Sequence, residues 1–143
     1  MKKNIRSSVF ETNSSSTHSI SINIGSYAGY TSITPDGNGK VTIEGRYFGW
    51  ERELYNDSET KASYCYAWAK GKKRYMGMLE DVLLEHTGAK EIEFDSSSTS
   101  SYGEVGIDHQ SYEVCETVFK GGKEIVKEFI FNPKSILTTD SDG

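Results

Sequence analysis

The sequence predicts a single α+β domain in which about three helices pack on a mainly antiparallel sheet. Residues 19–24 alternate strictly between polar side chains and isoleucine, which is typical of a strand with one buried face. Residues 72–86 carry apolar side chains at helical spacing, and Gly88 follows them as a common helix terminator. A hairpin pattern comes first, then helices, then strands mixed with a helix. This order favours α+β over a doubly wound α/β fold.

Length and composition are those of an ordinary globular protein. The 143 residues include 35% hydrophobic and 12% aromatic side chains, which is enough for one sizeable core. The net charge of −5 argues against charge-driven binding to nucleic acid or to an anionic membrane. The sequence has no apolar run of about 20 residues, and no apolar signal core follows its charged start. We therefore expect a cytoplasmic protein without a membrane span.

The first part of the chain, residues 1–55, is predicted to form a hairpin region. An extended arm or first strand covers residues 1–10, the alternating strand covers residues 19–24, and a further strand covers residues 41–48. Pro35-Asp36-Gly37-Asn38-Gly39 is a strong turn signal between the last two strands, so we expect these strands to pair. Gly45 indicates a bulge or the close approach of another segment.

The middle of the chain, residues 57–88, is predicted to form a pair of helices. Asp57 or Ser58 caps the first helix, which extends to about Lys70. Helical spacing assigns it a buried stripe of Ala62, Cys65, Tyr66 and Ala69. The second helix covers residues 72–86 and has an inward face of Tyr75, Met76, Leu79, Val82 and Leu83.

The last part, residues 89–143, is predicted to mix strands with one helix. Asn132-Pro133 ends that helix, because the residue before a proline disfavours helical geometry. The expected elements are strands at residues 89–95, 105–107 and 136–137, a segment at 112–119 that extends or pairs with the second of these strands, and a helix from 121 to 131.

A run of hydroxyl and amide side chains with one imidazole stands directly before the alternating strand. Such side chains donate and accept hydrogen bonds, so they can form the wall of a pocket for phosphate, sugar or peptide backbone. His18 can also exchange a proton near neutral pH. The alternative is a network of turn hydrogen bonds that closes a tight loop. The run consists of Thr12, Asn13, Ser14, Ser15, Ser16, Thr17, His18 and Ser19.

A second polar segment follows the predicted strand at residues 105–107. It consists of Asp108, His109, Gln110 and Ser111. A carboxylate can orient an imidazole, although neighbours on an extended strand point to opposite faces. The alternative is a polar strand end within a turn. If both segments are functional, we expect His18 and His109 to meet at one site, with Asp108 as a third catalytic candidate.

The remaining titratable side chains predict no metal or cofactor site. Cys65 and Cys115 lack CxxC or Cys-His spacing, and we expect both to be reduced and buried. His86 lies at a predicted helix C-terminus, where the helix dipole favours a cation. The basic cluster at residues 70–74 is flanked by aromatic side chains. A solvated break between helices is favoured there over a site for single-stranded nucleic acid.

Four scattered segments resemble a group of small uncharacterised proteins encoded by bacteriophages and prophages, mostly of Firmicutes. The resemblance implies a phage setting and a location in the cytoplasm of an infected host. Small phage proteins of this kind often act as host-takeover or anti-defence factors. The segments are Val9-Phe10-Glu11-Thr12-Asn13-Ser14-Ser15-Ser16-Thr17-His18-Ser19, His86-Thr87-Gly88-Ala89, Ile107-Asp108-His109-Gln110-Ser111 and Phe129-Ile130-Phe131-Asn132.

Three hypotheses for the function follow. The leading one is a non-enzymatic phage accessory protein that binds a nucleotide-like or phosphorylated ligand, or a host factor, through a pocket formed by the two polar segments. The second is an enzyme that acts on phosphate esters or nucleotides, with His18 and His109 as acid and base. The third is an inhibitor that binds another protein through aromatic side chains around the first hairpin.

Overall fold

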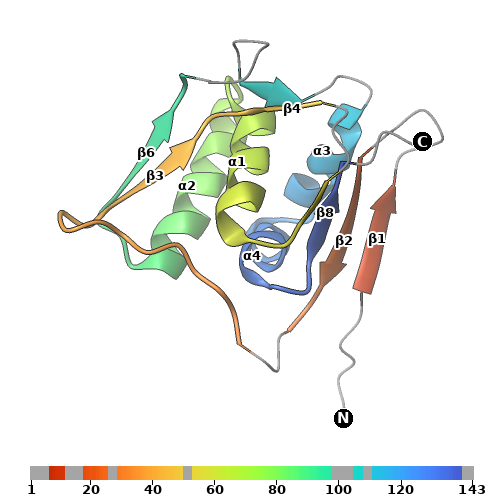
Figure 1. Cartoon of the computed structure of the whole chain (residues 1–143), viewed down its shortest axis with the longest axis horizontal. Coiled ribbons are helices and arrows are strands. Elements are labelled where there is room, and N and C mark those ends of the chain that lie inside the picture. Colours follow the sequence, from red (N-terminus) through yellow and green to blue (C-terminus); the bar gives the residue numbers. More distant parts are fainter. Residues whose placement is uncertain are drawn as a thin grey trace.

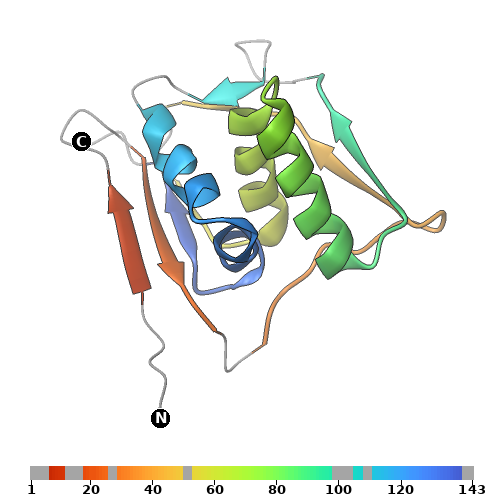
Figure 2. The ribbon, with the colours of Figure 1, turned by 180° about the vertical axis from the view of Figure 1, so that it is seen from behind.

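The α+β class is confirmed, but the strands lie on two sides of the helices. The computed structural model describes residues 7–11, 18–25, 29–49, 53–97, 105–107 and 111–139. Within these ranges the helices form a central group, with the four-stranded sheet on one side (Figure 1). The parallel pair of β3 (Lys40–Glu44) and β6 (Glu91–Asp95) lies on the other side, and the parallel pair of β4 (Tyr47–Phe48) and β7 (Gly106–Ile107) lies across one end of the helices. The view from behind shows the same arrangement (Figure 2).

The four-stranded sheet is antiparallel, and a strand from late in the chain lies inside it. Its order is β1 (Ser7–Glu11), β2 (Ser19–Asn23), β8 (Ile136–Thr138) and β5 (Leu54–Tyr55). Ile20 of β2 lies opposite Leu137 of β8, and both side chains are fully buried. The alternation predicts the burial of Ile20 and Ile22 correctly, since both are in the core, but Ile24 of the same predicted face lies beyond the end of β2 and is 38% exposed.

The expected hairpin between residues 19–24 and 41–48 is wrong. β3 (Lys40–Glu44) pairs in parallel with β6 (Glu91–Asp95), and β4 (Tyr47–Phe48) pairs in parallel with β7 (Gly106–Ile107). The turn at residues 36–39 does form, but its hydrogen bonds join Asp36 to Asn38, Gly39 and Lys40. The Gly39 carbonyl of the turn also accepts from the backbone N–H of Lys90 at 2.7 Å, and a pair of helices brings β6 to the edge of β3.

Gly45 lies where β3 passes into β4, and the predicted close approach is confirmed there. Its backbone N–H donates to the carbonyl oxygen of Asp95 at 2.8 Å. A Cβ at this position would overlap the Val105 side chain and would lie 2.6 Å from the Asp95 oxygen. Only glycine lets the two strands approach this closely.

The predicted helical pair is confirmed as α1 (Ser58–Ala69) and α2 (Lys73–Thr87). The Asp57 carboxylate caps α1 by accepting from the backbone N–H of Thr60 at 2.9 Å, and α2 ends at Gly88 with φ 74°. The predicted stripe of α1 is buried, but Lys61, Ser63, Tyr64, Ala67 and Trp68 are buried as well. The helix has no broad solvent face, because strands and the other helices cover most of it.

Residues 112–119 form a helix instead of the expected strand extension, so the described ranges contain four helices and not three. This element is α3 (Tyr112–Lys120), and α4 (Lys123–Phe131) follows it closely. The four apolar side chains of α3 that enter the core share one helical face. They are Val114, Cys115, Val118 and Phe119.

A buried polar network joins α1 to the end of α4. The ammonium group of Lys61 is fully buried and donates to the carbonyl oxygens of Asn132 and Ser135, each at 2.8 Å. The Asn132 side chain in turn donates to the Asn23 carbonyl at 2.8 Å and to the Glu128 carboxylate at 3.1 Å. Lys61 thus pairs with the carbonyl of Asn132, which caps α4, and with that of Ser135 in the turn after the helix.

Candidate functional site

His18, the imidazole of the first polar segment, lies in the core. Its side chain is 2% exposed. Nε2 donates to the carbonyl oxygen of Gly49 at 2.6 Å, and Nδ1 lies 2.8 Å from the Tyr64 hydroxyl. A carbonyl only accepts, so Nε2 carries a proton. Because protein groups occupy both ring nitrogens, this geometry favours a structural role, and proton exchange with a ligand requires His18 to leave these contacts.

The other predicted site residues are described only in part. Ser19 opens β2 opposite Glu11 and Thr138, and Ser111 is fully buried directly before α3. The remaining predicted residues lie outside the described ranges. They are Thr12, Asn13, Ser14, Ser15, Ser16, Thr17, Asp108, His109 and Gln110.

The described residues that flank the two polar segments meet at one place. His18, near the end of the first segment, bonds to Gly49. Phe48 precedes Gly49 and pairs with Ile107, the residue before Asp108. Phe48 also packs edge-on against Tyr64, with the ring centroids 5.0 Å apart. The end of the first segment and the residue before the second therefore both lie next to residues 48–49.

The thiols agree with the sequence prediction, whereas His86 departs from it. Cys65 and Cys115 are both free and fully buried, and burial raises the pKa of the Cys115 thiol. Burial, followed by the positive charge of Lys127, lowers the pKa of His86. The expected preference for a cation at this helix end is therefore outweighed.

Among the described residues no cluster of three His, Cys, Asp or Glu side chains suits a metal ion.

Residues 70–72 of the basic cluster form the turn between α1 and α2, and Lys73 and Arg74 begin α2. Lys72 donates to the carbonyl oxygen of Trp68 at 2.8 Å, and its ammonium nitrogen lies 4.7 Å from the centroid of the Trp68 ring. Burial lowers the pKa of Lys72. One cation of the cluster is therefore bound at the C-terminus of α1, as expected of a break between helices.

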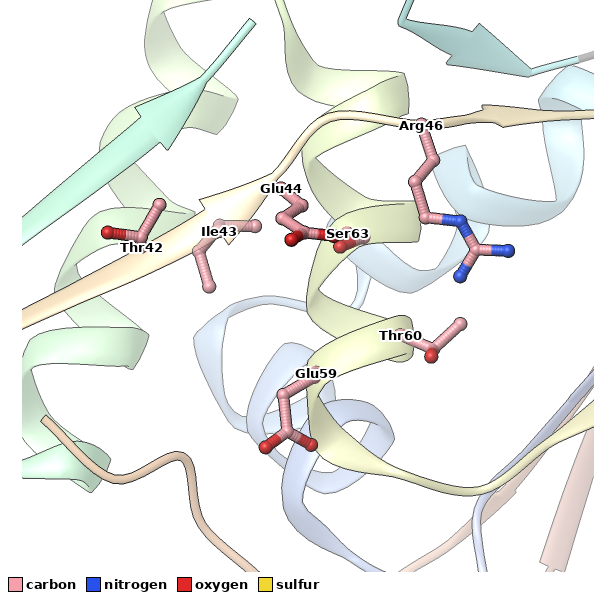
Figure 3. Close-up of a pocket in the computed structure, with 7 residues that line it drawn as sticks. All are labelled: Thr42, Ile43, Glu44, Arg46, Glu59, Thr60 and Ser63. Carbon is pink, nitrogen blue, oxygen red and sulfur yellow. The ribbon is translucent and has the colours of Figure 1, made fainter. Parts of the chain in front are cut away.

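A cavity that the sequence analysis missed lies between β3 and the first turns of α1 (Figure 3). Its volume is about 250 Å³. β3 and the residues that follow it contribute one wall, and the first turns of α1 contribute the other. The lining residues are Thr42, Ile43, Glu44, Arg46, Glu59, Thr60 and Ser63.

Arg46 is the cation of this cavity, and aromatic rings hold it in place. Its guanidinium carbon lies 4.7 Å from the centroid of the Phe48 ring and 5.5 Å from that of Tyr55. Nη2 donates to the Tyr55 hydroxyl at 3.4 Å. Within the described ranges no carboxylate forms an ion pair with Arg46. The guanidinium is thus oriented by aromatic contacts while its charge is not neutralised.

The other polar groups of the cavity are hydroxyls and carboxylates. Ser63 is only 4% exposed, and no residue of the described ranges forms a hydrogen bond with its hydroxyl. Glu44 and Glu59 are exposed at the rim. Figure 3 shows the Arg46 guanidinium on one side and both carboxylates on the other. The cavity therefore carries separated charges of both signs around a buried hydroxyl.

A second cavity of about 290 Å³ adjoins the first and shares Glu44 and Arg46 with it. Gly45, Asp95 and Ser97 complete its lining. The Asp95 carboxylate accepts from the Ser97 hydroxyl at 2.6 Å and from its backbone N–H at 3.0 Å. These bonds lower the pKa of Asp95, so the carboxylate is ionised at neutral pH.

The sequence predicts the outward position of Arg46, but it does not predict that the two walls of this cavity lie together. The alternation that places Val41, Ile43 and Gly45 inward also places Arg46 outward. No spacing along the chain, however, relates residues 42–46 to residues 59–63. Their proximity depends on how α1 packs beneath β3, which is a tertiary contact.

Within the described ranges no helix is long and apolar enough to cross a membrane. The chain was also compared with known proteins. No protein family, curated protein or solved structure matches it.

Proposed function

We propose that this protein is a non-enzymatic binding protein for a small phosphorylated ligand, and that the cavity around Arg46 receives the phosphate. The observation that carries the proposal is the guanidinium held over Phe48 and Tyr55 with no described carboxylate paired to it. Arginine binds phosphate through two parallel hydrogen bonds, and an arginine that is already oriented loses less conformational entropy on binding.

The hydroxyls and the size of the cavity also support this ligand class. Ser63 and Thr60 line the cavity and can donate to phosphate oxygens. The volume of about 250 Å³ is below the range of about 300–1,000 Å³ that is usual for sites of drug-sized ligands. A small phosphorylated metabolite suits it better than a nucleic acid, which the net charge of −5 also disfavours.

The biological setting is part of the proposal. The resemblance to phage and prophage proteins supports an accessory role in the cytoplasm of an infected host, in host takeover or in evasion of host defence. The polar segments at residues 12–19 and 108–111 are proposed as a further binding surface. Their flanks meet at residues 48–49, at the end of the strand that carries Phe48.

Two other functions each have one supporting observation. An enzyme acting on phosphate esters, with His18, His109 and Asp108 as its catalytic groups, is supported by the common neighbourhood of the two flanks. The burial of His18 counts against it. A protein-binding inhibitor is supported by the exposure of Leu54 and Tyr30, which are 62% and 43% accessible.

The test measures binding of inorganic phosphate, ethyl phosphate and adenosine monophosphate by calorimetry and by the shift in thermal unfolding. We expect at least one of them to stabilise the wild type. Arg46→Gln should remove this stabilisation, and Arg46→Lys should weaken it because lysine lacks the planar fork. Arg74→Gln is the matched control, since Arg74 is exposed over the Tyr75 ring and lies outside both cavities.

Two results would count against the proposal. If none of the three phosphates binds the wild type, the cavity is not a phosphate site. If Arg46→Gln and Arg74→Gln lower affinity equally, the binding reflects net charge and not the cavity. Release of inorganic phosphate from the esters on incubation would favour the enzyme hypothesis instead.

A further inference from the structure

We propose that the ligand of the Arg46 cavity carries a cation as well as a phosphate, so that its class is a small phosphorylated amine. This inference rests on the proposed function and adds the second charge of the ligand. It follows from the charges that line the cavity, where one guanidinium faces two carboxylates, those of Glu44 and Glu59. Asp95 adds a third carboxylate in the adjoining cavity.

A simple phosphate is poorly matched to this set of charges. It is attracted by Arg46 but repelled by the rim carboxylates, inside a protein whose net charge is −5. A ligand that carries an ammonium group beside its phosphate pairs with both signs of charge. Like-charge contacts are then replaced by attractive ones, which is how such sites discriminate between ligands.

The charges of the cavity are free to act on a ligand, because they do not neutralise one another. Within the described ranges Arg46, Glu44 and Glu59 form no ion pair, either with each other or with another residue. Binding therefore does not first require breaking an internal salt bridge. Figure 3 shows the guanidinium and the Glu59 carboxylate on opposite sides of the cavity.

A buried hydroxyl lies between these charges. Ser63 is 4% exposed and has no hydrogen-bond partner among the described residues, and it projects from α1 into the cavity (Figure 3). The Ser63 hydroxyl oxygen is itself accessible from the cavity, so a ligand atom that bonds to it takes the place of water. An ester or phosphate oxygen is a suitable acceptor for this hydroxyl.

The experiment compares three probes that differ by one charged group. Phosphoethanolamine carries both charges, ethyl phosphate lacks the ammonium group, and ethanolamine lacks the phosphate. We expect phosphoethanolamine to bind about tenfold more tightly than ethyl phosphate, as one added charge-assisted hydrogen bond predicts, and ethanolamine to bind the most weakly. Glu44→Gln and Glu59→Gln should each reduce the advantage of phosphoethanolamine, and the double variant should abolish it.

Glu113→Gln is the control for Glu59→Gln, because each glutamate is the acidic residue in the first turn of its helix and each is exposed. It corrects for the lost interaction with the helix dipole, and it should leave the phosphoethanolamine advantage unchanged. Glu44 is exposed as well, so we expect all three variants to fold, and thermal unfolding of each one checks this.

The outcomes separate this inference from the proposed function. If phosphoethanolamine and ethyl phosphate bind with equal affinity, and both affinities depend on Arg46, the phosphate site is supported. The inference that the ligand carries an ammonium group is then wrong. If the double variant of Glu44 and Glu59 leaves the advantage intact, the amine is not held by these carboxylates and the inference also fails. If neither phosphate binds, or if ethanolamine binds as tightly as phosphoethanolamine, the proposed function itself is lost.

Discussion

The Tyr64 hydroxyl lies 2.8 Å from Nδ1 of His18, and this contact joins the residue directly before β2 to the middle of α1. The same imidazole bonds to the Gly49 carbonyl through Nε2. One histidine therefore links three segments that are far apart in the sequence, and it does so inside the core.

The first prediction concerns the role of His18. His18→Ala removes two buried hydrogen bonds and leaves a cavity, so we expect the free energy of unfolding to fall by about 2–4 kcal/mol. Tyr64→Phe removes the hydroxyl that contacts Nδ1 of His18 and should cost about 1 kcal/mol. Urea unfolding measures both changes. A variant at His18 that keeps its stability but loses ligand binding would instead assign the imidazole to a binding site.

The second prediction concerns Gly45. Gly45→Ala places a methyl group against Val105 and the Asp95 carbonyl, and overpacking of this kind costs about 1–3 kcal/mol. Gly37→Ala is the matched control, because no atom lies within 4 Å of a Cβ there. Thermal unfolding of the two variants tests the difference. Equal stabilities would mean that β3 and β6 separate without cost.

The third prediction concerns Lys61, whose pKa burial lowers to about 8. Between about pH 8 and pH 10.5 the unfolded chain binds a proton at this lysine that the folded chain does not. The contribution of Lys61 to stability therefore rises with pH across this window, by an amount on the order of 3 kcal/mol.

The measurement for Lys61 compares the pH dependence of urea unfolding in wild type and Lys61→Met. The difference between them should grow from about pH 8 to about pH 10, whereas Lys73→Met, at an exposed lysine of α2, should show no such trend. The comparison is needed because burial raises the pKa of Cys115, which makes overall stability fall with pH in the same range. A constant difference would show that Lys61 keeps its ordinary pKa in the fold.

The fourth prediction concerns the two thiols. Because Cys65 and Cys115 are fully buried, a water-soluble disulfide reagent at about pH 8 should label neither of them in the native protein within minutes. In urea it should label both. The absorbance of the thiolate released from the reagent gives the number of cysteines that have reacted. Rapid labelling of the native protein would show that α1 and α3 separate readily.

Sequence periodicity predicts the helices and strands that bury a single face. It fails for elements whose conformation or strand partner depends on tertiary contacts. α2 has one apolar face and a terminating Gly88, and its position is predicted closely. α3 is predicted as a strand because its valines and Thr117 favour extended structure, although Val114 and Val118 share a helical face. The partner of β3 is mispredicted because a turn sequence does not specify which strand pairs beyond it.

The candidate site is less predictable than the fold. The hydroxyl-rich run draws attention to His18, yet the imidazole is held by Tyr64 and Gly49, neither of which lies near it in the sequence. No sequence pattern around Arg46 predicts a binding role, because a single arginine is common on the solvent face of a strand. Its significance comes from Phe48, Tyr55 and α1, and these are brought together only by packing.

The position of β8 has a consequence for synthesis on the ribosome. β2 emerges early, but its neighbour β8 belongs to the last described part of the chain. Until residues 136–138 have left the exit tunnel, β2 and β5 lack the strand that joins them, so the sheet stays incomplete while the helices are being translated. β2 therefore gains its neighbour β8 only after α1 to α4 have been made.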